Sequence, residues 1–172
     1  MIGTIFAFGL AGLGFFILEN LVGAAQVHIR PLTLLLFYLG LDEDLTPAFV
    51  LALFFGLLQD SYALTPFGLH LVGALFVVGV ARFCRLRFML RTPVPQVLAS
   101  LAILFLQDGC LRLSLAVLAT RPTLLDYLSY ALLLEILGTA ALAPLVFLLL
   151  GALKRLTGGS RPRSREVDLF VP

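Results

Sequence analysis

Six long apolar runs, separated by short polar segments, dominate the pattern along this chain. Each run is continuous, whereas the strands of a membrane barrel alternate apolar and polar residues over about ten positions. The pattern therefore predicts an all-α fold, a polytopic membrane bundle of about six transmembrane helices. The predicted helices cover residues 2–18, 23–41, 48–59, 68–83, 93–119 and 124–153. They form one domain over 1–153, followed by a basic cytoplasmic tail at 154–172 that we predict to be disordered.

The second run is the least regular. Its clean apolar part, residues 32–41, covers only about 15 Å at helical rise, half of the hydrocarbon thickness of a bilayer. Two interpretations follow. Either His28 and Arg30 lie in the outer interface, where the Arg30 side chain snorkels, or the helix is a short half-span.

Composition supports the membrane assignment. The chain is 60% hydrophobic and 13% charged, against about 45–50% and about 25% in soluble domains. Cys84 and Cys110 have neither metal-ligand spacing nor the pattern of a disulfide framework. The sequence has no nucleophile motif, phosphate-binding loop or metal-ligand cluster, and its basic tail is short. We therefore predict a protein that is not an enzyme, holds no cofactor and binds no nucleic acid.

Basic residues set the predicted orientation. The fourth and fifth helices are joined by a loop with four arginines, and the tail holds five basic residues, so nine of the twelve basic residues lie on one side. The positive-inside rule places this side and both termini in the cytoplasm, with the 60–68 turn facing outward. The loop arginines are candidates for contacts with lipid or cytoplasmic partners: Arg82, Arg85, Arg87 and Arg91.

Small residues recur every four positions in two helices, which places them on one face of each helix. Such stripes let another helix approach closely, although they also arise by chance in membrane helices. Asp60 continues the second stripe, so we expect its side chain to turn inward. The candidate contact faces are Gly3, Ala7 and Ala11 in the first helix, and Ala48, Ala52 and Gly56 in the third.

Charged residues also interrupt the last two runs. Asp108 and Arg112 are one helical turn apart and can pair. Asp108 and Glu135 lie equally far from the turn between their helices, so we expect them at the same depth, about 16 Å in. The three form a candidate intramembrane ion network. We favour a structural latch between two helices over an ion pathway, since buried charge pairs often serve packing.

The stretch at 55–70, FGLLQDSYALTPFGLH, joins the third and fourth helices. Asp60 places a carboxylate at the edge of hydrocarbon, Pro66 marks a turn, and Gly68 permits a positive φ. We expect these residues to shape the outward turn or a cavity beneath it. The tripeptide Leu-Gln-Asp at 58–60 recurs at 106–108, which is too short to establish a repeat.

Four features resemble the rod shape-determining protein MreD family of bacteria across nearly the whole chain. They are Arg30-Pro31 before a leucine-rich run, GLLQD at 56–60, PFGLH at 66–70, and the isolated Asp108 in the fifth helix. The resemblance implies a fold similar to the substrate-binding subunits of energy-coupling-factor transporters. It also implies a non-enzymatic inner-membrane subunit of the cell-elongation complex, which supports peptidoglycan synthesis and cell shape. MreC is then the direct partner, with MreB, RodA and a class B penicillin-binding protein in the wider complex.

The alternative is a small-molecule-binding subunit of a membrane transporter. Its cavity would lie among the helices near Asp60, Asp108 and Glu135. A metabolite held by the purified protein would favour this alternative, whereas stable recovery of a single-span partner would favour the scaffold.

Overall fold

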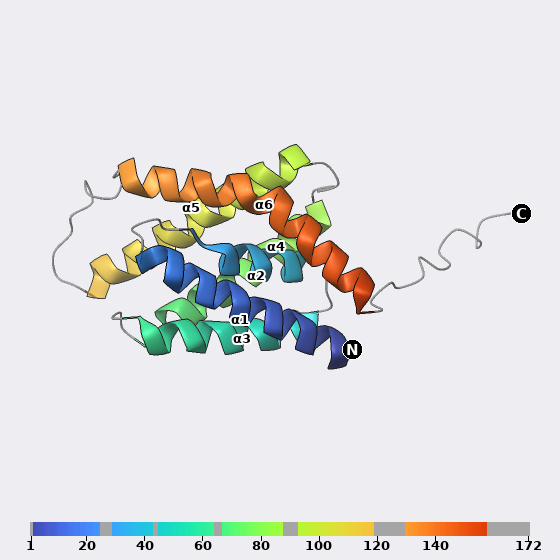
Figure 1. The fold of residues 1–172 in the computed structure, drawn as a ribbon. Coiled ribbons are helices and arrows are strands. Elements are labelled where there is room, and N and C mark those ends of the chain that lie inside the picture. The colour runs from blue at the N-terminus through green and yellow to red at the C-terminus, as the bar shows by residue number, and fades with distance from the viewer. Residues whose placement is uncertain are drawn as a thin grey trace, which may run out of the picture.

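The computed structural model of the chain describes residues 2–24, 29–42, 45–63, 67–87, 93–118 and 130–157. Regular structure in these ranges is entirely α-helical, which confirms the predicted all-α class. The ribbon shows successive helices running in opposite directions, so both chain ends lie at the same end of the bundle (Figure 1). The described helices are α1 (Ile2–Ala24), α2 (Pro31–Asp42), α3 (Leu45–Tyr62), α4 (Leu69–Arg87), α5 (Pro93–Leu118) and α6 (Tyr130–Leu156).

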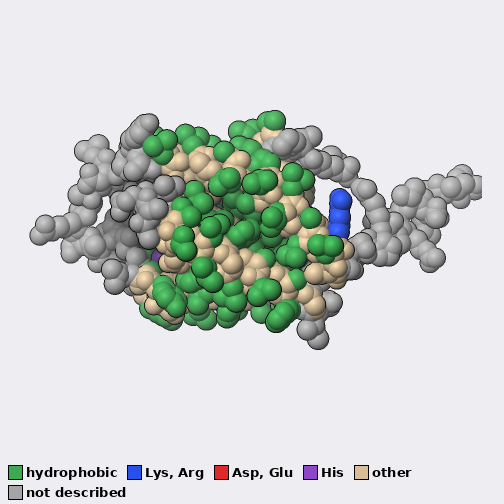
Figure 2. Space-filling view, in the orientation of Figure 1, with side chains coloured by type: hydrophobic (Ala, Val, Ile, Leu, Met, Phe, Trp, Pro, Cys, Tyr) green, Lys and Arg blue, Asp and Glu red, His purple; other side chains and the backbone are tan. Residues whose placement is uncertain are grey.

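Three helices of the described chain are long and apolar enough to cross a membrane, in the segments Ile5–Gly23, Val94–Leu111 and Leu133–Leu156. Large hydrophobic side chains are exposed along them, including Phe6 at 72% and Leu148 at 73%. The space-filling view shows a face on which the described residues present mainly hydrophobic side chains, with Lys or Arg atoms visible at one end (Figure 2). Apolar surface of this extent is typical of lipid contact, and these features indicate a membrane protein.

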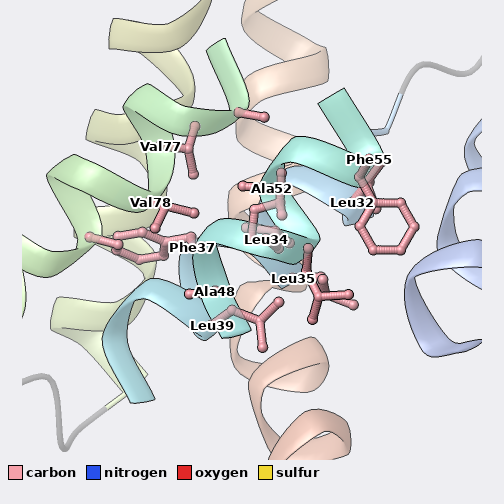
Figure 3. Close-up of a cluster of buried hydrophobic side chains, with 14 of the residues drawn as sticks. Leu32, Leu34, Leu35, Phe37, Leu39, Ala48, Ala52, Phe55, Val77 and Val78 are labelled. Atoms are coloured by element: carbon pink, nitrogen blue, oxygen red, sulfur yellow. The ribbon is translucent and has the colours of Figure 1, made fainter. Parts of the chain in front are cut away.

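Helix α2 forms the centre of the bundle and packs against each of the other five helices. Its residues are apolar all round, as expected of a helix enclosed on every side, and Leu32, Leu34 and Leu35 are completely buried. Figure 3 shows this core, in which side chains of α2 meet those of α3 and α4. Twelve residues reach about 18 Å, so the described helix is shorter than the hydrocarbon thickness of a bilayer.

Glycines allow two close approaches to α4. A Cβ on Gly56 of α3 would lie 2.7 Å from Cα of Leu71, and one on Gly40 of α2 would lie 3.0 Å from the carbonyl oxygen of Val78. Ala48 and Ala52 are buried in the same core. The second small-residue stripe therefore packs against other helices of this bundle.

The first small-residue stripe, in α1, is only partly buried. Gly3 is exposed, and a Cβ there would meet no atom within 4 Å. Ala7 is half-buried and Ala11 packs against the edge of the core. The close approach of α1 instead occurs at Gly12, where a Cβ would overlap the buried ring of Phe55. Figure 3 shows Phe55 projecting from α3 toward α1.

Several helix ends differ from the predicted ones. Helix α1 continues through Glu19 to Ala24, and α6 extends past the predicted domain boundary at 153 to Leu156. Helix formation does not stop at one polar side chain when the following residues remain good helix formers. Pro66, Arg91 and the predicted tail beyond 157 lie outside the described residues, as do the side chains of Arg87 and Arg112.

A candidate functional site at the N-terminal end of α2

A polar cavity of about 270 Å³ lies at the end of the bundle opposite the two chain termini. It forms there because α2 begins deep inside the bundle and leaves space before its first turn. Each of the six described helices contributes at least one lining residue. The cavity is lined by Glu19, Ile29, Arg30, Thr33, Gln59, His70, Gln107, Leu111 and Glu135.

Arg30 holds the centre of this site. Its Nε lies 2.5 Å from Oε1 of Glu135 on α6, and its Nη2 lies 3.2 Å from Oδ1 of Asp108 on α5. Its backbone N–H donates to the Thr139 hydroxyl at 3.2 Å. That hydroxyl in turn donates to the carbonyl oxygen of Glu135 at 2.7 Å. Charge-assisted bonds of this kind are strong, so Arg30 ties the start of α2 to two other helices.

The structure brings Asp108 and Glu135 of the predicted network together and adds Arg30, which bonds to both. The predicted pair of Asp108 with Arg112 lies outside the described residues, because the side chain of Arg112 is not among them. The place of Arg30 follows from the start of α2. Pro31 occupies the first turn, where proline is favoured, and this start lies inside the bundle. Arg30 is thereby placed beside the carboxylates of Asp108 and Glu135.

Asp60 caps the next helix. Its carboxylate accepts backbone N–H groups from Gly68 at 3.0 Å, His70 at 2.9 Å and Leu71 at 3.1 Å. These belong to the start of α4, where N–H groups have no partner within the helix. A negative charge is also favourable at a helix N-terminus. Gly68 has a φ of 98°, which fits the positive φ expected there, so the turn is built around the inward-facing Asp60.

Two buried oxygen atoms of the cavity lining have no hydrogen-bond partner among the residues that the structure describes: Oε2 of Glu19 and Oε1 of Gln107. Glu19 also faces Arg30 and the backbone N–H of Leu32 at the start of α2. The sequence alone did not single out Glu19 or Gln107. The recurring tripeptide was the available signal, because Gln59 and Gln107 both line the cavity and the aspartates after them are both buried.

The other candidate residues do not join this site. Arg82 is half-buried and Arg85 is exposed, both near the opposite end of α4. Neither Cys84 nor Cys110 lines the cavity. Within the described ranges, no group of three His, Cys, Asp or Glu residues is arranged to hold a metal ion.

The arrangement combines an anchored arginine, surplus carboxylates and two unpaired acceptors in a space that could hold a small molecule. Its interpretation rests on this chemistry alone, because no family model, curated protein or solved structure matches the chain.

Proposed function

We propose that the chain is a non-enzymatic subunit of the bacterial cell-elongation complex, similar to MreD, and that it binds MreC in the inner membrane. One observation supports this most. The residues that carry the resemblance lie far apart in the sequence, yet they converge at one end of the bundle. A chance resemblance would leave them scattered. These residues are Arg30, Asp60, Gly68, His70 and Asp108.

In this proposal the helices cross the membrane six times and both termini are cytoplasmic, with an arrangement similar to the substrate-binding subunits of energy-coupling-factor transporters. The alternating helix directions and the common end of the two termini support an even number of crossings. Arg82 and Arg85 lie toward the end that holds the termini, where they would face anionic lipid or cytoplasmic partners.

Helix α1 is the surface that we assign to MreC. Only 11% of its apolar segment is buried, against 39% for α6. Of the small-residue stripe on this helix, Gly3 is exposed and Ala7 is half-buried, whereas Ala11 packs against the core. Small residues at such positions suit the close approach of a single transmembrane helix. The stripe of α3 is already occupied by contacts within the chain. Through MreC the protein would help to organise MreB, RodA and a penicillin-binding protein during peptidoglycan synthesis.

A pull-down from the native membrane tests this function. Tagged protein is solubilised in detergent, and the recovered proteins are quantified by mass spectrometry. We expect MreC in near-equal amount, and a loss of at least about tenfold when Gly3→Leu and Ala7→Leu are combined. Gly79→Leu is the matched control, because Gly79 is exposed on α4 and a Cβ there meets nothing within 4 Å. If the wild-type protein recovers no MreC, the proposed function is wrong.

The polar cavity favours a second candidate, a small-molecule-binding subunit of a transporter. Such a subunit needs a concave site with a few placed polar groups, and the cavity around Arg30 provides one. The same pull-down separates the two functions. Recovery of an ATPase-linked membrane subunit in place of MreC would establish the transporter function.

A further inference from the structure

We propose that the polar cavity at the N-terminal end of α2 binds a small organic molecule through a primary ammonium group. The inference rests on the cavity itself and not on MreC binding, so either can fail without the other.

The unpaired atoms define the first requirement for the ligand. Oε2 of Glu19 and Oε1 of Gln107 are both buried and both line the cavity, and only 6% of Gln107 is exposed. Buried acceptors are normally hydrogen-bonded. Because both atoms accept hydrogen bonds, the missing partner must donate. A protonated primary amine offers three N–H donors from one atom.

Charge defines the second requirement. The carboxylates of Glu19, Asp108 and Glu135 lie near the guanidinium of Arg30. Asp108 and Glu135 bond to that guanidinium, whereas Oε2 of Glu19 has no hydrogen-bond partner among the described residues, so the ionised Glu19 side chain offers a negative charge to the cavity. An anion would be repelled there, whereas a cation near Glu19 would be attracted. His70, also in the lining, can accept or donate a hydrogen bond.

Size and lining define the third requirement. A cavity of about 270 Å³ lies just below the usual range of small-molecule pockets, about 300–1,000 Å³. Ile29 and Leu111 add apolar wall, which suits a short carbon chain. These features suit an organic ammonium compound, either a free amine or the amine-bearing headgroup of a lipid.

Calorimetric titration of the purified full-length protein with ethanolamine tests the proposal. The protein is washed in amine-free phosphate buffer with a detergent that carries no amine. Ethylene glycol and glycolate are matched probes, since one lacks the charge and the other reverses it. We expect both to bind at least about tenfold more weakly than ethanolamine. Equal binding of ethylene glycol, or no binding of ethanolamine to protein that keeps its helical circular dichroism, would overturn the proposal.

Variants locate the site. Glu19→Gln removes the charge and Gln107→Leu removes an acceptor at similar volume, so each should weaken ethanolamine binding about tenfold. Ser100→Ala is the matched control, because the Ser100 hydroxyl is also buried without a partner among the described residues but does not line the cavity. Its binding should equal that of the wild type. Unchanged binding in both cavity variants would exclude this cavity as the site.

Nanodiscs distinguish the two sources of the ammonium group. If phosphatidylethanolamine nanodiscs abolish the binding of free ethanolamine and phosphatidylcholine nanodiscs do not, the lipid headgroup is the occupant. If ethanolamine binds equally in both, a free amine is the ligand. Either result supports an ammonium site, and neither depends on MreC.

Discussion

Arg30 and Glu135 are in direct contact, with Nε of Arg30 2.5 Å from Oε1 of Glu135, although they are 105 positions apart in the sequence. The contact joins the first turn of the central helix to α6, and the Asp108 bond extends it to α5. The arrangement of the polar end of the bundle depends on this one cation.

Replacing Arg30 by glutamine should lower the free energy of unfolding by about 3 kcal/mol, because it leaves two carboxylates without their cation. This is the lower part of the range for broken buried pairs, since 27% of the Arg30 side chain is exposed. Unfolding by SDS in mixed micelles, followed by circular dichroism, measures the change. Arg155→Gln is the control at an exposed position and should shift stability by no more than about 0.5 kcal/mol.

The double variant Asp108→Asn with Glu135→Gln tests the latch against the ion pathway. If the carboxylates only anchor Arg30, the variant should lose stability while still recovering MreC and supporting rod shape in growing cells. Adding Arg30→Gln to this double variant should lower the free energy of unfolding by less than the sum of the two separate losses, because the three side chains interact directly with one another. Loss of function in a variant that remains fully folded would instead favour the pathway.

Asp60→Ala should destabilise the protein by about 1–3 kcal/mol, since three backbone N–H groups at the start of α4 lose their acceptor. Ser61→Ala is the neighbouring control. The Ser61 side chain is exposed and bonds only to the carbonyl oxygen of Leu57 in the preceding turn, so its loss should change stability by less than about 0.5 kcal/mol. Equal effects of the two substitutions in SDS unfolding would contradict the capping role.

Gly56→Ala should cost about 1–3 kcal/mol, because the new methyl group meets backbone atoms of α4 that cannot move separately from their helix. Gly79→Ala places the same methyl group in open space on α4. It should leave stability unchanged or raise it by up to about 1 kcal/mol, as expected for alanine in a helix. Thermal unfolding by circular dichroism compares them, and a stabilised Gly56→Ala variant would refute the close packing of α3 and α4.

Thiol labelling tests the proposed orientation. Single cysteines are placed by Ser61→Cys and Thr157→Cys in a background where Cys84 and Cys110 are alanine. A membrane-impermeant maleimide should label the Ser61→Cys protein in intact spheroplasts, and the Thr157→Cys protein only after the membrane is opened. The reverse pattern would mean that the positive-inside argument was misapplied to this chain.

The features predicted well from the sequence were local ones. Continuous apolar runs predicted the helices, and the four-residue spacing from Ala48 to Asp60 predicted that Asp60 turns inward. The part that Arg30 takes in the ion network was not predictable in the same way. It depends on how deeply α2 begins, which is set by packing against five other helices. The unpaired acceptor of Gln107 could not be foreseen either, because it depends on side-chain geometry from separate helices.

Helix α2 also has a consequence for biogenesis. A segment of about 18 Å is too short to be retained in the bilayer as an independent span by the insertion machinery. It must therefore enter together with a neighbouring helix, and its final position is reached only after α4, α5 and α6 have left the ribosome and closed around it. Truncated chains that end before α5 would leave α2 without its enclosure and Arg30 without its carboxylates. Membrane quality-control proteases would then recognise such chains as incomplete.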